Sequence, residues 1–390
     1  MQRLSAETRA ILLLCGHFSP APHGSKPLTP AEFRRLNNWL AARQMTPGQL
    51  LQSDLPETLQ RITGIKIAAH RLTSLFSRVE ELERALEAWG NAGIWVISVS
   101  ERGFPGCLRQ RLKSAVSPLL FGAGDPDRLC RGGVCVIGSR DSRPDGLAFA
   151  RLMGRRCGEA AMTVISSDMR GVDREAISTT LAVGGSVVSV VSDSLIKAVS
   201  AKRNRGPLAD GAMTMVTPFS PDTRFTVANA MRINKYQYAL SDVAVIVETR
   251  RRGGIWSGAE ENRSEGWVPA FVRSGKTVSQ GNLALLHLGY QPITQEEVAA
   301  CADIRKYFID RRHSATAPMA TQAGADLYAQ FLAELLNIAA EPLSAPEVAA
   351  HFRIEEVQAR AWLDRAVSEG HMHKPADGGE YGRVPSANRD

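Results

Sequence analysis

Apolar residues recur every three or four positions through the first ninety residues, which is the spacing of amphipathic helices. The stretch 30–43 shows this most clearly, with Thr29 as the expected N-cap and Pro30 in the first turn. Further along, residues 59–72 place Gly64 between two apolar turns. This segment is either a helix-hairpin-helix that points amides at a DNA phosphate or an ordinary turn between packed helices. The pattern predicts a helical domain, of the SAM or helix-hairpin-helix type, over residues 1–92.

From Gly93 the pattern changes to short apolar runs rich in β-branched residues, separated by stretches of helical length. Strands that alternate with helices form right-handed βαβ units, and such units build a mostly parallel sheet. We therefore predict a Rossmann-like, doubly wound α/β domain over residues 93–298. The seven predicted strands are 94–99, 134–137, 162–165, 186–191, 213–216, 243–247 and 268–272.

The pattern changes again after residue 298. Residues 299–324 include a run of small and polar residues, and we predict a linker there. Three helical stretches and a final Gly370-His-Met-His follow over residues 325–390, in the order of a winged-helix-like domain. The third of these helices has more acidic than basic residues, so it suits contact with a protein at least as well as contact with DNA.

The composition is that of an ordinary globular protein, with 44% hydrophobic and 22% charged residues among 390. The 47 Lys and Arg exceed the 40 Asp and Glu by seven, a surplus compatible with a polyanionic partner. The early apolar run 11–15 is far too short for a membrane span. Six scattered cysteines contain no C-x-x-C pair, which favours a reduced compartment. We expect a cytoplasmic protein without membrane segment, metal site or cofactor.

Two predicted strands end in loops suited to an anion. The first opens into Gly138-Ser139-Arg140 just before a helix: the glycine lets the backbone approach a phosphate, the helix amides face it, and the arginine adds a forked contact. Neither a G-x-G-x-x-G fingerprint nor a P-loop is present. The second loop carries Ser167, Arg170, Gly171 and the expected helix cap Asp173.

Further basic residues follow other predicted strands. Lys202 and Arg203 come after the strand 186–191, and Arg251 lies in the run 250–252 after the strand 243–247. Because the carboxyl ends of parallel strands share one edge of a sheet, these loops should form a basic groove for single-stranded nucleic acid. The nearby aromatic residues Tyr236, Tyr238 and Trp256 would either stack on bases there or face the core of their helix.

The order of these motifs resembles the DNA-processing protein A (DprA/Smf) family. The resemblance covers residues 94–295 and includes Pro118-Leu-Leu-Phe-Gly-Ala-Gly-Asp125, the two anion loops, 232–241 and 279–289. It implies a non-enzymatic homodimer or larger homo-oligomer that binds single-stranded DNA, with Asn234 and Lys235 in the family's R-N-R segment. It further implies protection of strands during natural transformation or recombination and their delivery to a RecA-type recombinase. A divergent member could instead serve antiviral defence.

The sequence departs from the family pattern at several positions, including Ile177 in place of a histidine. A second resemblance lies at 252–260, which is similar to the P-G-G-x-G-T-x-x-E motif of lysine-decarboxylase-like (LOG) phosphoribohydrolases. That alternative implies a nucleotide sensor, or a hydrolase with Glu260 at the ribose. We expect no catalysis, because Arg252 and Trp256 replace the family's small, rigid residues. The alternative nucleotide pocket would consist of Gly253, Gly254, Ser257 and Glu260.

Overall fold

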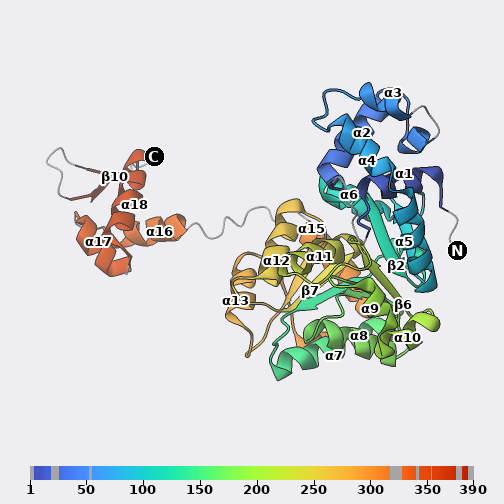
Figure 1. Ribbon diagram of the computed structural model, residues 1–390. Coiled ribbons are helices and arrows are strands. Elements are labelled where there is room, and N and C mark those ends of the chain that lie inside the picture. The colour runs from blue at the N-terminus through green and yellow to red at the C-terminus, as the bar shows by residue number, and fades with distance from the viewer. Residues whose placement is uncertain are drawn as a thin grey trace. The chain divides into compact units, whose positions relative to one another are not determined.

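The computed structural model describes residues 4–18, 26–51, 55–316, 327–339, 342–352, 354–374 and 380–384. The chain divides into two compact units, residues 1–315 and 316–390 (Figure 1). Among the described residues, no helix has both the length and the apolar character needed to cross a membrane.

The first unit is built on a nine-stranded sheet in the order β1-β2-β6-β5-β4-β3-β7-β8-β9. In this sheet β2 alone runs in the direction opposite to the other strands, so the predicted Rossmann-like, mostly parallel sheet is confirmed. The chain begins its parallel part at β3, adds β4 to β6 on one side, and then adds β7 to β9 on the other. The strands are β1 (Trp95–Ser98), β2 (Leu119–Ala123), β3 (Val134–Gly138), β4 (Val164–Ser166), β5 (Val187–Val190), β6 (Met213–Thr217), β7 (Val243–Glu248), β8 (Ala270–Arg273) and β9 (Gln291–Ile293).

All seven predicted strands are present, and two strands, β2 and β9, were not predicted. The run of β2 contains Gly122, and its neighbours are not β-branched, so its pattern is weak. The structure explains the glycine: a Cβ at this position would lie 2.3 Å from the ring of Trp95 on β1. The strand is therefore specified by the indole that packs on it, which the local sequence does not reveal.

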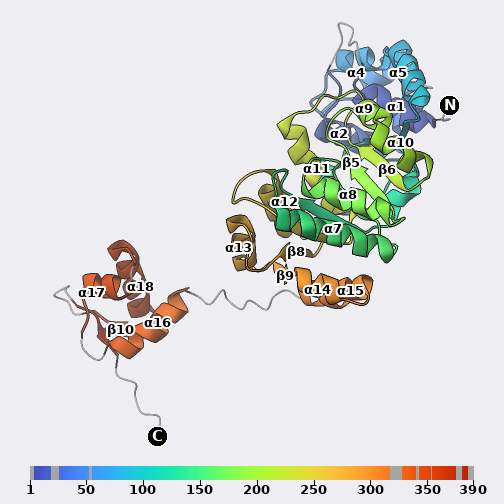
Figure 2. The ribbon, with the colours of Figure 1, turned by 90° about the horizontal axis from the view of Figure 1, so that it is seen from below.

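Helices cover both faces of the sheet, as expected for a doubly wound fold (Figures 1 and 2). One face carries α7 (Pro144–Glu159), α8 (Val172–Ala182), α9 (Leu195–Ser200), α10 (Lys202–Ala209), α14 (Gln295–Ala300) and α15 (Ile304–Thr316). The other carries α6 (Gly106–Leu112), α11 (Val227–Leu240), α12 (Gly254–Glu265) and α13 (Gln280–His287), with the 3₁₀ helices η2 (Lys113–Ala115) and η3 (Pro126–Cys130).

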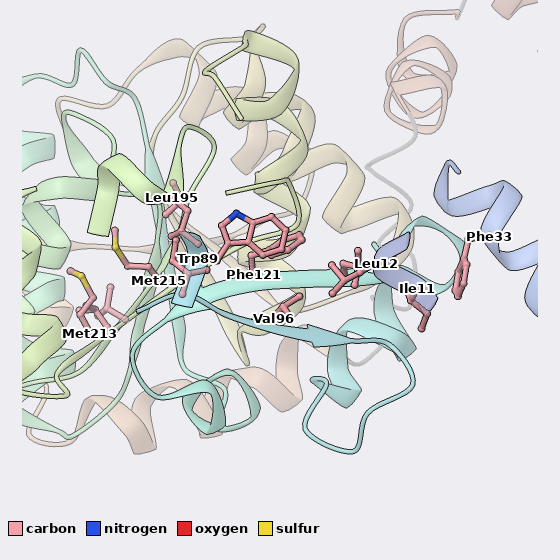
Figure 3. Packing of buried hydrophobic residues seen from close by; sticks show 14 of the residues in the cluster. Ile11, Leu12, Phe33, Trp89, Val96, Phe121, Leu195, Met213 and Met215 are labelled. Atoms are coloured by element: carbon pink, nitrogen blue, oxygen red, sulfur yellow. The ribbon is translucent and has the colours of Figure 1, made fainter. Parts of the chain in front are cut away.

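The N-terminal helices share a hydrophobic core with the first of these faces (Figure 3). Trp89 lies edge-on to Phe121 of β2, with 5.1 Å between the ring centroids, and Leu12 is fully buried in the same cluster. The expected domains 1–92 and 93–298 therefore lie within one compact unit. These helices are α1 (Ala6–Cys15), α2 (Pro30–Ala41), α3 (Leu55–Gln60), α4 (Ala69–Phe76) and α5 (Val79–Asn91), with the 3₁₀ helix η1 (Pro47–Leu51).

Local signals define the ends of these N-terminal elements. The predicted N-cap Thr29 forms a capping box with Glu32, in which each side chain accepts from the other residue's backbone amide. The turn between α3 and α4 contains Gly64, whose φ of 80° suits glycine, and it buries Ile62 and Ile65 beneath it. A DNA-facing role for this turn stays a prediction.

The segment expected to be a linker is helical over its first half. Residues 304–316 form α15 because Ile304 and Phe308 are buried, and the ring of Phe308 packs against Phe271 of β8 at 5.5 Å. The sequence pattern did not predict this helix, because small and polar residues follow Ile304 and Phe308 at the end of the segment. Residues 317–324 of the expected linker lie outside the described residues.

The second unit has its own core, and its described residues form three helices and a short hairpin. Leu343, which precedes α17, forms an isolated β-bridge with Tyr381 beside the hairpin. Each arginine on α18 forms an ion pair within the helix, Arg360 with Glu356 and Arg365 with Glu369. The winged-helix assignment stays a prediction. The elements are α16 (Leu327–Ile338), α17 (Ala345–Phe352), α18 (Glu356–Ser368), β10 (Met372–His373) and β11 (Gly382–Arg383).

Candidate nucleic-acid interface

The candidate interface lies where the parallel strands end, and we call this the carboxyl edge of the sheet. The topology gathers there the loops 139–143 after β3, 167–171 after β4, 191–194 after β5, 218–226 after β6 and 249–253 after β7. Because β3 lies between β4 and β7, the point where strand order reverses falls between the loops after β3 and β7. Ligands of open α/β sheets commonly bind at such a crevice.

The chain's own Glu248 occupies this crevice. Its carboxylate is 7% exposed and accepts from the Arg143 amide at 3.1 Å and from the Ser142 hydroxyl. The Arg143 guanidinium lies 3.4 Å from the same carboxylate, and the Ser139 amide donates to the Glu248 carbonyl at 2.9 Å. The Arg143 amide at the start of α7 thus already contacts an internal anion, and the Ser139 amide is paired as well, so these two groups of the expected cradle are not free.

A second buried carboxylate, Asp173, joins the loops after β3 and β4. One of its oxygens accepts from the Gly138 amide at 3.2 Å, and the other accepts from the Ser167 hydroxyl. Burial raises the pKa of Asp173 to about 7, although these two hydrogen bonds and the charge of Arg140 act to lower it. Gly138 and Ser167 therefore come together as predicted, but their polar groups donate within the chain.

Gly171 is the N-cap of α8, so the prediction that Asp173 caps this helix is wrong: Asp173 lies in the first turn. Gly171 also completes the contact between the two loops. Its φ is 90°, and a Cβ there would lie 2.5 Å from the Ser139 carbonyl oxygen. A side chain at this position would force the loops apart. Gly171 therefore allows the two loops to approach each other closely. A ligand would contact the side chains around this glycine.

Arg140 and Arg170 extend from these loops into solvent. The Arg140 guanidinium lies over the ring of Phe225, 5.2 Å from its centroid, and Arg170 pairs with the equally exposed Asp141. Phe225 is 39% exposed and belongs to the loop after β6. Sequence reasoning missed this residue. The available signal was an aromatic side chain between polar residues in a loop after a predicted strand.

Lys202 and Arg203 begin α10, which follows α9 at the end of β5. Arg203 reaches the loop after β4, where its Nη2 and Nε donate to Asp168 at 2.5 and 2.9 Å. Lys202 is exposed and forms no ion pair with any residue in the described ranges. Both residues therefore lie on the predicted side of the sheet.

The run Arg250 to Arg252 follows β7 on the same edge. All three side chains are exposed, and none pairs with an acidic residue in the part of the chain that the structure describes. Arg251 thus stands, as predicted, among the most accessible cations of the carboxyl edge.

The predicted residues of α11 are less accessible. The Asn234 side chain is buried and donates to the Gly254 carbonyl at 2.8 Å, which fixes the start of α12. Lys235 pairs with Glu261 at 3.0 Å. The proposed stacking role of Tyr236 and Tyr238 is wrong: both rings are buried in the core.

The alternative nucleotide pocket is not enclosed. Gly253 adopts a φ of 107° as it enters α12, Gly254 follows it, and the side chains of Ser257 and Glu260 are exposed on the first turns. Trp256 is partly buried against the core. A cavity of about 400 Å³ does open at the carboxyl edge, but it lies at the ends of β4, β5 and β6, and none of these residues lines it.

The fold and the loops at its carboxyl edge define a Rossmann-like protein with exposed cations at the ends of its parallel strands. Residues 95–301 match the family model of DNA recombination-mediator protein A, and the chain belongs to that family. The chain matches no curated protein by sequence.

Two solved structures illustrate the likeness. DNA processing protein A from Streptococcus pneumoniae is 18% identical, with a TM-score of 0.58 over 77% of this chain and 99% of the other, which shows a shared fold. DNA processing protein A from Helicobacter pylori, described in terms of its single-stranded DNA binding mode, is also 18% identical. It covers 57% of this chain and 99% of its own, with a TM-score of 0.47.

Proposed function

We propose that this protein binds single-stranded DNA along the carboxyl edge of its sheet, as a non-enzymatic member of its family. The observation that carries the proposal is that cations from three loops and from the start of α10 gather on one edge. Arg140, Arg170, Arg203 and the run 250–252 all lie there, although more than a hundred residues separate the first from the last. Membership of the family of DNA recombination-mediator protein A supports a nucleic-acid ligand.

The same edge suits a strand without a fixed sequence. Exposed guanidinium groups contact phosphates, which are the same at every nucleotide. Phe225 offers a partly exposed ring, and any base can stack on an aromatic face. Arg140 lies over that ring, and its Nη2 also donates to the Met169 sulfur at 3.2 Å. These features favour single strands, whose bases are free to stack, over duplex.

The test is fluorescence anisotropy with a labelled single strand and with a duplex of equal length. Arg140→Ala should weaken single-strand binding by about tenfold, the size of one charge-assisted contact, without lowering thermal stability. Arg155→Ala is the matched control, because Arg155 is an exposed arginine on α7 beyond the carboxyl edge. Equal affinity for both ligands, or equal loss in both variants, would refute the proposal.

The resemblance to the family also leads us to infer a homodimer that protects strands and passes them to a RecA-type recombinase. Sedimentation velocity measures the oligomeric state directly. Recombinase loading is measured by filament formation on strands already coated with a single-strand-binding protein. A monomer with no effect on filament formation would exclude this role and favour the defence role instead.

A further inference from the structure

We propose that the cavity at the ends of β4, β5 and β6 binds a phosphate monoester, as the phosphorylated end of a DNA strand or as a free nucleotide. The strand-end form rests on the proposed function, because it requires the strand to lie along the same edge. The cavity volume of about 400 Å³ is near the lower end of the roughly 300–1,000 Å³ typical of small-ligand sites. It suits one nucleotide.

The charge of the lining favours a monoester over a diester. Four cationic and two acidic residues line the cavity, so the lining carries a net charge of +2. A phosphate monoester carries about 1.5 to 2 negative charges at neutral pH, whereas a phosphate within a strand carries about one. The more highly charged group therefore gains more from this site. The six residues are Asp168, Arg170, Arg174, Asp193, Lys197 and Arg203.

Asp168 holds two of these cations in place before any ligand arrives. Its side chain is only 10% exposed, and it pairs with Arg203 at 2.5 Å and with Arg174 at 3.6 Å. Asn204 donates to the same carboxylate at 3.5 Å. The two guanidinium groups remain 53% and 45% exposed, so each keeps donors for a second anion. Fixing them in advance lowers the conformational entropy lost on binding.

The remaining walls provide a free cation and an aromatic surface. Lys197 on α9 is exposed and pairs with no acidic residue in the described ranges. Phe225 lines the cavity from the loop after β6, with Arg140 over its ring. A nucleotide could thus place its phosphate among the arginines and its base near Phe225, with the strand continuing toward Arg140.

The experiment compares ends of one oligonucleotide. Anisotropy is measured with a 5′-phosphate, a 3′-phosphate and hydroxyl ends only, while adenosine monophosphate and adenosine are titrated by calorimetry. If the site binds a strand end, a terminal phosphate should raise the affinity for the oligonucleotide by about tenfold, the size of one charge-assisted contact. If it binds a free nucleotide, adenosine monophosphate should bind and adenosine should not. Preference for the 5′- or the 3′-phosphate identifies a strand end, and binding of the mononucleotide alone identifies a free nucleotide.

Variants then place the effect in the cavity. Lys197→Gln should remove most of the gain from the phosphate while keeping the affinity for hydroxyl-ended strands within about twofold. Arg203→Gln should also remove most of that gain. Lys197→Gln guards against misfolding, because Lys197 has no described ion-pair partner to lose. Arg155→Gln should keep the gain. Equal affinity for all ends together with no mononucleotide binding would overturn the proposal yet leave strand binding intact. Mononucleotide binding without strand binding would overturn the proposed function alone.

Discussion

Asp173 should make the stability of the first unit fall as pH rises toward neutrality. Its carboxyl is 4% exposed, and burial raises its pKa from the ordinary 3.8 to about 7. Between these values the unfolded chain has released the proton while the folded chain still holds it. The unfolded state therefore binds fewer protons, and the free energy of unfolding decreases with pH across this window and levels off above it.

The magnitude follows from the size of the shift. Each pKa unit corresponds to about 1.4 kcal/mol, so the full shift of about three units costs ~4 kcal/mol above pH 7. Between pH 5 and 7 the loss is about 2–3 kcal/mol. Two groups that couple to Asp173 do not titrate there, because burial raises the pKa of Cys135 and of Tyr238 well above this range.

The assay is urea unfolding, monitored by tryptophan fluorescence, of the wild type and Asp173→Asn from pH 5 to 8.5. The amide is isosteric: its oxygen can accept from the Gly138 amide, and its NH₂ can donate to Ser167. The variant should gain about 2–3 kcal/mol on the wild type between pH 5 and 7 and no more above pH 8. Asp210→Asn, which removes an exposed carboxylate, is the control. A constant difference between wild type and Asp173→Asn would refute the reasoning.

Three further outcomes are expected at the carboxyl edge. Replacing Arg250, Arg251 and Arg252 together by Ala should lower the slope of log affinity against log salt by about 2, at about 0.7 per phosphate contact; an unchanged slope would place the strand elsewhere. Lys235→Ala should weaken strand binding less than Arg140→Ala, because Glu261 already pairs with the ammonium; the reverse order would contradict this. Adenosine and cytidine monophosphates should release no free base by chromatography, and turnover lost in Glu260→Gln would instead establish a hydrolase.

The sequence by itself determined the strands of the parallel sheet and the edge on which the loops gather. Runs such as 134–137 and 243–247 are apolar throughout because both faces of these strands are buried, and this information is local. Once strands alternate with helices, right-handed crossovers place every carboxyl end on one edge. The positions of Arg140, Arg203 and Arg251 on that edge therefore followed without coordinates.

Only the tertiary structure decided which polar groups on that edge remain free for a ligand. Glu248 accepts from the Ser142 hydroxyl and from the Arg143 amide at the start of α7, more than a hundred residues away in the sequence. Asp168 and Arg203 meet across 35 positions, and Phe225 reaches Arg140 from the loop after β6. Residue spacing encodes which face of an element is buried, but pairing between charges depends on distances between loops. Those distances exist only once the sheet has brought the loops together.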